Sequence, residues 1–177
     1  MNAPASSAVT QETDRLLGAR PRTLCHTERV SSSRRYPDRP ILGVGAIIED
    51  GGRVLLVERG QEPLKGVWSL PGGAVEVGEH LKDAIRREVR EETGLEVDSL
   101  SIAEIFERIM PDAAGRTEYH YVLIDYLCKV TGGELRAASD ASRAVWVPRG
   151  ELANYDITEG TLEVIERALV AWSTLPK

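Results

Sequence analysis

The sequence predicts an α/β fold, an α/β/α sandwich in which helices cover both faces of a mixed β-sheet. Three observations lead to this prediction. Short apolar runs bounded by Gly and Pro recur along the chain, as is typical of strands. Two segments, one central and one C-terminal, have the apolar periodicity of helices. The chain of 177 residues is long enough for one well-buried domain and short for two.

The strands are predicted from the apolar runs and from the turns between them. Residues 41–49 form a β-branched run suited to a buried strand. A DGG turn joins this run to a second strand at 53–59, which makes a hairpin. The stretch 60–73 is predicted to be a loop because Pro and Gly interrupt it. Further strands are expected at 74–77, 100–110, 118–130, 133–137 and 144–148.

Helices are expected in the middle and at the end of the chain. The central helix is predicted over residues 80–93, and Gly94 follows where helices commonly end in a left-handed residue. A short helix is expected at 149–155 and a last helix at 159–172. The apolar face of the last helix comprises Leu162, Ile165, Leu169 and Trp172. We expect the central helix on one face of the sheet and the last helix on the other.

Composition and charge exclude several classes of protein. The formal net charge of −6 disfavours a nucleic-acid binder that relies on a basic surface, so no DNA partner is expected. No apolar stretch reaches the roughly 18 to 20 residues that span a bilayer, and no apolar leader is present. The two cysteines, Cys25 and Cys128, are too few for a disulfide framework, and Cys128 is expected to be a buried thiol. These features predict a cytoplasmic setting without a membrane partner.

Residues 1–38 differ in composition from the rest of the chain. They hold few large apolar residues and many Ser, Arg and Pro, which is a poor basis for a core. Up to Pro40, seven Arg oppose four acidic residues. We therefore predict a disordered, mildly basic tail over 1–38 and a folded domain over 39–177. The tail is either simply solvated or an arm that attracts phosphate groups.

Three glutamates in the central helix, Glu88, Glu91 and Glu92, point to chemistry. On a helical wheel of about 100° per residue they continue the arc of the apolar residues. The opposite arc holds Lys82, Asp83, Arg86 and Arg90, as a solvated face should.

A run of charges is usually solvated, but carboxylates on the inward arc need a compensating cation. Buried unpaired charge is costly, and the C-terminal end of a helix is its negative end. Arg87 reaches Glu91 at i+4, yet one guanidinium does not neutralise three carboxylates. Clustered carboxylate oxygens suit hard divalent ions such as Mg²⁺. The pattern therefore predicts a site for divalent metal.

The residues around these glutamates resemble a complete Nudix box, with every specified position filled. The residues that carry it are Gly73-x5-Glu79-x7-Arg87-Glu88-Val89-x-Glu91-Glu92-x-Gly94-Leu95. The flanking stretches "GAIIEDGGRVLLVER" and "GVWSLPGG" also resemble the family, so that the similarity covers roughly residues 41–172. It implies a Nudix-type α/β/α sandwich. One departure is His80, where many members carry Ser or Thr, and this removes a helix cap.

The resemblance implies a hydrolase that splits the pyrophosphate of a nucleoside diphosphate linked to another moiety, by attack of water on phosphorus. It implies Mg²⁺ as cofactor, with Mn²⁺ able to substitute. The implied metal ligands are Glu88, Glu91, Glu92 and the carbonyl of Gly72. Arg87 is expected to brace the glutamates, Glu79 to tether the loop before the helix, and Gly73 to contact the substrate.

The sequence offers several candidates for the general base. The family does not keep this residue in one place, so a box glutamate is one candidate. Asp140, in the later loop, is another and competes with a role in capping a turn. Glu134 is a poorer candidate.

The substrate is sought outside the box. Pro111 stands sixteen residues after Leu95, a spacing similar to that of ADP-ribose pyrophosphatases in this family, although a turn also explains a proline. Trp68 is expected to contact the substrate by stacking on a base. Tyr119 and Tyr121 either stack in the same way or belong to the core, and His120 is expected to be structural.

Three other functions remain as alternatives to ADP-ribose or a related nucleoside diphosphate sugar. One is a sanitising pyrophosphohydrolase that acts on damaged nucleoside triphosphates. Another, of a different class, is a non-catalytic ligand sensor, which usually lacks box glutamates. A third is processing of RNA 5′ ends, which the acidic body disfavours. A homodimer is compatible with each of these.

Overall fold

The computed structural model describes residues 34–172. The chain divides into two units, Met1–Ser31 and Ser32–Lys177, and the described residues all belong to the second. Residues 1–33 of the predicted tail therefore lie outside the described residues. No helix in the described part is long and apolar enough to cross a membrane.

Seven strands form one mixed sheet between two helices, as predicted. The order in the sheet is β3-β2-β1-β6-β5, with β4 paired to β1 and β7 paired to β2. The strands β1 and β6 are parallel, and all other pairs are antiparallel. The strands are β1 Ile41–Asp50, β2 Arg53–Arg59, β3 Trp68–Ser69, β4 Gly72–Ala74, β5 Leu95–Pro111, β6 Thr117–Gly133 and β7 Ala141–Pro148. The helices are α1 Leu81–Thr93, the 3-10 helix η1 Arg149–Asn154 and α2 Thr161–Trp172.

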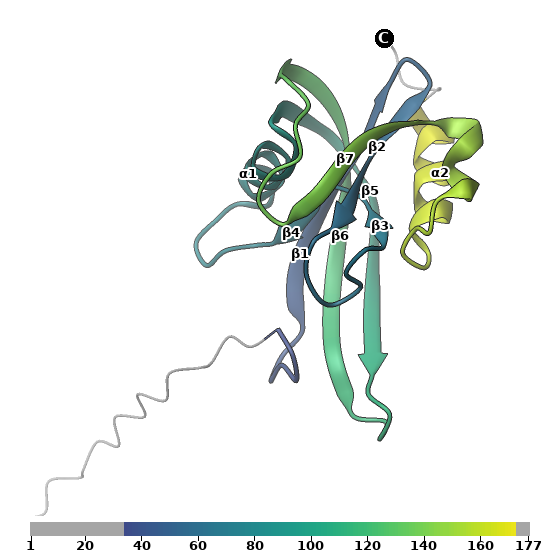
Figure 1. Cartoon of the computed structure of the whole chain (residues 1–177). Coiled ribbons are helices and arrows are strands. Elements are labelled where there is room, and N and C mark those ends of the chain that lie inside the picture. The colour runs from purple at the N-terminus through teal and green to yellow at the C-terminus, as the bar shows by residue number, and fades with distance from the viewer. Residues whose placement is uncertain (1–33, 173–177) are drawn as a thin grey trace, which may run out of the picture. The chain divides into compact units, whose positions relative to one another are not determined.

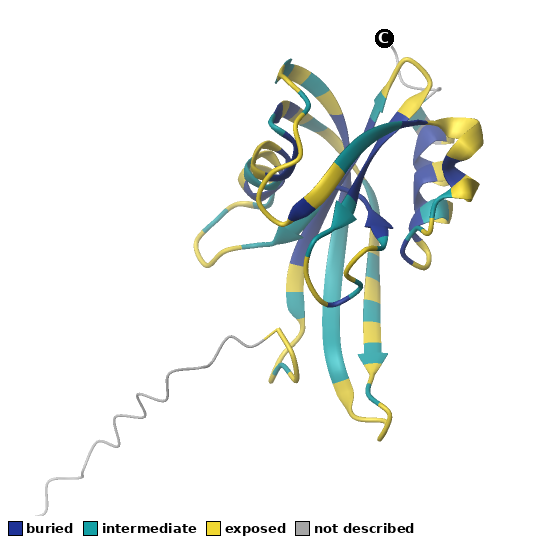
Figure 2. Ribbon diagram, in the orientation of Figure 1, coloured by how far each residue is buried: buried dark blue, intermediate teal, exposed yellow. Residues whose placement is uncertain are grey.

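The strands alternate their side chains between two cores, one under each helix. In β1, Ile47 packs on the side of α2, whereas Ala46 and Ile48 pack on the side of α1. The two helices lie on opposite faces of the sheet (Figure 1). Buried residues gather on the central strands and on the inner faces of the helices, whereas the far end of the β5–β6 hairpin has none (Figure 2). The α/β/α sandwich is confirmed.

The strands β1 and β2 pair only beside their turn, and this divergence creates room for the site. Their register consists of Glu49 with Val54 and Asp50 with Arg53. Further along, β1 pairs with β4 from Gly43 to Gly45, whereas β2 pairs with β3 and β7. The loop and the two short strands between β2 and α1 therefore enter the gap between the two longer strands.

The ends of α1 agree with the sequence prediction. His80 is the N-terminal capping position, and its side chain makes no capping hydrogen bond. Gly94 ends the helix at φ 70°, and its N–H bonds to the carbonyl of Arg90. A left-handed residue satisfies a terminal carbonyl in this way, and glycine adopts it without strain.

Two predicted strands are wrong. The strand expected at 74–77 is displaced, because β4 ends at Ala74 and Val77 is fully exposed. The strand expected at 133–137 does not form beyond Gly133. The chain there instead passes the end of α1, where the N–H groups of Arg136 and Ala138 bond to the carbonyls of Thr93 and Glu92. These carbonyls would otherwise lack partners at the helix end.

Residues 34–38, which the sequence analysis assigns to the tail, lie next to the turn between β5 and β6. The backbone N–H of Tyr36 bonds to the carbonyl of Glu118 at 2.7 Å. Its hydroxyl bonds to Asp112 at 3.0 Å, and the guanidinium of Arg116 lies 4.9 Å from the centre of its ring. The folded part therefore begins a few residues before the predicted boundary.

Candidate active site

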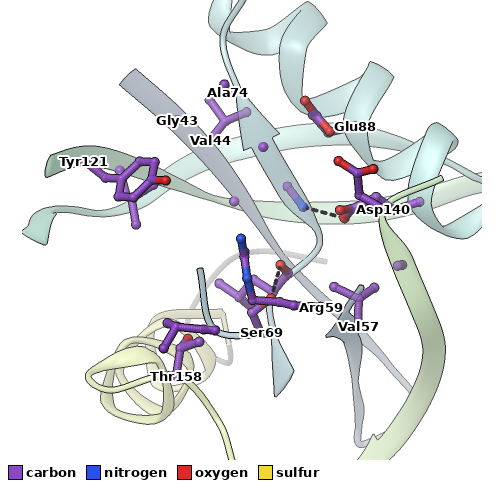
Figure 3. Close-up of a pocket in the computed structure, with 18 of the residues that line it drawn as sticks. Gly43, Val44, Val57, Arg59, Ser69, Ala74, Glu88, Tyr121, Asp140 and Thr158 are labelled. Atoms are coloured by element: carbon purple, nitrogen blue, oxygen red, sulfur yellow. Dashed lines mark hydrogen bonds between the residues drawn. The ribbon is translucent and has the colours of Figure 1, made fainter. Parts of the chain in front are cut away.

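A cavity of about 360 Å³ lies where β1 and β2 diverge. Its walls come from β1, β2, β4, α1, the β5–β6 hairpin, the loop before β7 and the start of α2. Gly72 and the box residues Gly73, Glu88, Glu91 and Glu92 all line it. Figure 3 shows Glu88 and Asp140 on one side of this cavity and Tyr121 on another.

Glu92 is buried at the edge of this cavity, with 8% of its surface exposed. Its Oε2 accepts a hydrogen bond of 2.9 Å from the backbone N–H of Gly72. Burial raises the pKa of Glu92 to about 7, the neighbouring Glu88 adds to this, and the Gly72 hydrogen bond opposes it. Burial also raises the pKa of Glu88. The two carboxylates thus lack the solvation that normally stabilises their charge.

Arg87 joins the box carboxylates to the loop that precedes α1. Its Nε and Nη2 bond to the two oxygens of Glu79 at 2.8 and 2.9 Å. Its Nη1 bonds to Glu88 at 2.8 Å and to Glu91 at 3.3 Å, and Nη2 also reaches the carbonyl of Ala74 at 3.2 Å. The Arg87 hydrogen bonds lower the pKa of Glu79 to about 2. A single guanidinium therefore fixes both the loop and two of the glutamates.

The two glycines of β4 allow this close approach. A Cβ added to Gly73 would lie 2.5 Å from the carboxylate of Glu88. A Cβ added to Gly72 would lie 2.1 Å from the carbonyl oxygen of Val44, and Gly72 has φ +152°. Larger residues at either position would displace the carboxylate or the strand.

The chemical groups around the cavity are of a type that can bind a divalent cation. Within residues 34–172, no three His, Cys, Asp or Glu side chains are already arranged to hold a metal. Instead, Glu88 bonds to Arg87, Glu92 bonds to Gly72, and the side chain of Glu91 is 45% exposed. The atoms that could bind the ion are nevertheless all oxygens, which Mg²⁺ prefers as ligands. Coordination by Glu88, Glu91, Glu92 and Gly72 stays a prediction.

Asp140 lines the same cavity as the box residues. Its Oδ1 accepts a hydrogen bond of 2.7 Å from the side-chain amide of Gln61. Its charge contributes to the raised pKa of Glu92. Glu134, the poorer candidate for the general base, is exposed and does not line the cavity.

The structure places Trp68 in the core and not in the cavity lining. The residue is 8% exposed, and its ring meets Tyr155 edge-on at 5.2 Å between ring centres. The expectation that Trp68 contacts the substrate is therefore corrected. Its position on the two-residue strand β3, which pairs with β2, turns the side chain toward α2.

The other aromatic candidates divide between the cavity and the opposite side of the hairpin. Tyr121 lines the cavity. The ring of Tyr119 stacks on the ring of Tyr121, with 6.3 Å between the ring centres. His120 bonds to Glu107 at 2.8 Å and does not line the cavity, in line with a structural role. Pro111 ends β5 and is likewise outside the lining.

Sequence reasoning missed several polar residues of the cavity, among them Ser69, Arg59, Arg108 and Asp125. The side chain of Arg59 bonds to the carbonyl of Pro63, and that of Arg108 bonds to the carbonyl of Glu159. A period of two over Phe106, Arg108 and Met110 indicates that these three share one strand face. Nothing in the sequence shows that this face meets the box.

Comparison with known proteins shows relatives with two kinds of substrate. The chain is 39% identical over 105 residues to the ADP-ribose pyrophosphatase of Methanocaldococcus jannaschii, a match covering 59% of this chain and 60% of that protein. It is 29% identical over 129 residues to the human 8-oxo-dGDP phosphatase NUDT18, a match covering 71% of this chain and 37% of that protein. The chain thus spans only part of the length of each.

A solved structure agrees with the fold. The crystal structure of the MutT NUDIX hydrolase from Burkholderia pseudomallei superposes with a TM-score of 0.64 at 30% identity. The superposition covers 73% of this chain and 98% of that one. The NUDIX domain matches residues 39–168, which include the sheet, α1 and the cavity that holds the box glutamates. The chain therefore belongs to the NUDIX domain family.

Proposed function

We propose that this chain is a metal-dependent hydrolase that splits the pyrophosphate of a nucleoside diphosphate linked to another moiety. The observation that carries the proposal is the buried pair Glu88 and Glu92, which Arg87 and Gly72 hold in position at the wall of the cavity. Because burial raises the pKa of both carboxylates, a bound cation would favour their charged forms.

In this proposal Glu88, Glu91, Glu92 and the carbonyl of Gly72 hold Mg²⁺, for which Mn²⁺ substitutes. When bound, such an ion neutralises phosphate charge and lowers the pKa of a bound water. Arg87 keeps Glu88 oriented, and Glu79 keeps Arg87 in place through two hydrogen bonds. Gly73 leaves the space in which the carboxylate of Glu88 and the substrate approach β4.

Asp140 is the proposed proton acceptor for the attacking water. It lines the cavity beside the glutamates, and its hydrogen bond from Gln61 holds one oxygen while the other stays available. A general base must reach the proton that it abstracts, and apart from the box glutamates Asp140 is the cavity carboxylate that acts electrostatically on Glu92.

Besides Arg34 and Arg87, two further arginines line the cavity together with the carboxylates. Arg59 and Arg108 both line it, and each guanidinium is anchored by a backbone carbonyl. Fixed cations that face a metal site are suited to hold the phosphate groups of an anionic substrate. We assign the pyrophosphate to the space between these arginines and the box.

The substrate we propose is ADP-ribose or a related nucleoside diphosphate sugar. Similarity to the archaeal ADP-ribose pyrophosphatase, at 39% identity, supports this choice. The alternative is a damaged guanine nucleotide, supported by the similarity to the human 8-oxo-dGDP phosphatase.

The test is hydrolysis of a panel of ADP-ribose, dGTP, 8-oxo-dGTP and a diadenosine compound with Mg²⁺ or Mn²⁺. ADP-ribose should yield AMP and ribose 5-phosphate, with kcat/KM at least about tenfold above the others, which is roughly 1.4 kcal/mol of transition-state binding. Better turnover of 8-oxo-dGTP would overturn the substrate and leave the chemistry intact. Binding of ADP-ribose without turnover of any compound would favour a sensor. Activity that survives exhaustive chelation would contradict metal dependence.

A further inference from the structure

Asp125 of β6 is a buried carboxylate that the proposed hydrolysis does not use. It is 4% exposed, and it lines the cavity. Among the interactions of the described residues, none is a hydrogen bond or ion pair of the Asp125 side chain. Buried carboxylates nearly always have partners, because an unpartnered one is costly to desolvate. The Asp125 oxygens are not among the fully enclosed unpaired atoms of the described residues, so they are open to the cavity, where a bound molecule can donate hydrogen bonds to them.

The position of this carboxylate depends on the neighbouring strand. Asp125 pairs in parallel register with Gly45 of β1. A Cβ added to Gly45 would lie 2.2 Å from Oδ1 of Asp125, so the carboxylate occupies space that only a glycine leaves open. The place of Asp125 beside the cavity is thus a feature of two strands and not of one flexible side chain.

Asp125 lies within one substrate length of the box. Gly45 also pairs with Gly72, whose N–H bonds to Glu92. Two strand spacings, about 10 Å, therefore separate the backbone of Asp125 from β4. A nucleotide whose pyrophosphate lies at the box can reach Asp125 with the group next to its phosphates.

The carboxylate of Asp125 itself favours an uncharged group over another phosphate. Leu70, Leu123 and Phe106 line the same cavity. Arg108 attracts the carboxylate and Glu104 repels it, while the guanidinium of Arg108 is held by the carbonyl of Glu159. A carboxylate repels phosphate and accepts hydrogen bonds, so it suits a neutral group that carries N–H or O–H donors.

On the basis of the proposed hydrolysis, we propose that Asp125 is a specificity-determining residue that accepts hydrogen bonds from two adjacent donors on the substrate, beyond its phosphates. Two parts of a nucleotide present such a pair: the cis-diol of a ribose, and the ring N–H with the 2-amino group of guanine. The corresponding edge of adenine offers a donor beside an acceptor and does not match. An adenine nucleotide would therefore place a ribose at Asp125, whereas a guanine nucleotide would place its base there.

The experiment compares the wild type with Asp125→Asn on matched pairs of substrates. One set is ADP-ribose with analogues that lack one hydroxyl of either ribose. The other is dGTP with dITP, whose base lacks the 2-amino group. In one of the two sets the wild type should prefer the complete substrate by about tenfold in kcat/KM, because a buried acceptor left unpaired is costly. Asp125→Asn should abolish that preference, mainly through KM, since its amide replaces one acceptor by a donor.

The control variant is Glu107→Gln, on the neighbouring strand but outside the cavity. It removes the same charge and should keep the wild-type preference, and the Tm of both variants reports folding. The proposal is overturned if Asp125→Asn keeps the wild-type preference in both sets, or loses activity equally on both members of each pair.

Failure of the hydrolysis proposal is distinguishable, because the wild type would then split no member of either set. Calorimetric Kd values for the same pairs then decide. Binding that discriminates in the wild type and not in Asp125→Asn supports the inference, and equal discrimination in both contradicts it.

Discussion

Glu92 and Arg87 show how single residues prepare this site. The helical wheel predicts that Glu88, Glu91 and Glu92 turn inward, and the structure buries Glu92 and largely buries Glu88. Glu91 stays exposed because its position is at the edge of the buried arc. The predicted contact from Arg87 to Glu91 is present, and the shorter bonds to Glu79 and Glu88 are additional. Periodicity thus predicts direction, whereas the exact partners depend on the loop before the helix.

Replacing Arg87 by lysine tests its role in orienting the glutamates. Lysine keeps the charge but cannot bond to Glu79, Glu88 and Ala74 together, because it lacks the planar fork of arginine. We expect Arg87→Lys to lower kcat by about tenfold to a hundredfold and to raise the Mg²⁺ concentration required. Steady-state kinetics over a Mg²⁺ titration measures both. Arg86→Lys, at an exposed position that bonds to Asp98, is the matched control and should behave as the wild type.

Asp125 predicts a dependence of stability on pH. Burial raises its pKa from 3.8 to about 7, with Arg108 opposing and Glu104 adding to this shift. The folded state therefore binds the proton more tightly than the unfolded state. The stability that this provides is complete below pH 3.8 and is lost as pH rises through about 7. Asn does not titrate. The Tm of Asp125→Asn minus the Tm of the wild type should therefore increase by roughly several degrees from pH 5 to pH 8.

Thermal unfolding of both proteins at intervals of pH measures this difference. Glu96→Gln, which removes an exposed carboxylate, should run parallel to the wild type over the same range. A constant Tm difference between Asp125→Asn and the wild type would show that Asp125 titrates normally.

At the scale of elements, the sequence predicts α1 and the long strands but not the short pieces between them. The apolar run 41–49 and the periodicity of 80–93 are local patterns, and the structure has both elements. The short strands β3 and β4 form because β1 and β2 diverge, which is a tertiary event. Likewise, backbone N–H groups of residues 134–138 bond to carbonyls at the end of α1, and local composition does not reveal this contact.

The strand β4 offers a direct test of the contact between the loop and the helix. A methyl group on Gly73 would collide with the carboxylate of Glu88, so Gly73→Ala should displace it and reduce kcat by about a hundredfold. Gly150→Ala, where an added Cβ meets no atom within 4 Å, is the control and should retain activity. Wild-type kcat in Gly73→Ala would show that Glu88 need not occupy this position.

At the scale of the whole molecule, the cavity collects residues that are far apart in the sequence. The box comes from one continuous stretch, so sequence alone identifies it. Arg108 and Asp125 reach the cavity because β6 pairs in parallel with β1, whereas Arg59 reaches it from the end of β2. No local pattern predicts that pairing. The half of the site proposed to bind metal is therefore predictable from the sequence, and the half proposed to bind the nucleotide is not.

The central claim is that the box glutamates perform the hydrolysis through a bound cation. The most direct measurement is kcat on ADP-ribose at saturating Mg²⁺ for the wild type, Glu91→Gln and Glu92→Gln, with Glu96→Gln, at an exposed position outside the cavity, as control. Removing one group that stabilises transition-state charge should lower kcat by on the order of a hundredfold or more in the first two variants. Their Tm should stay close to that of the wild type, and Glu96→Gln should keep full activity. Near-wild-type turnover by either Glu91→Gln or Glu92→Gln would contradict the account.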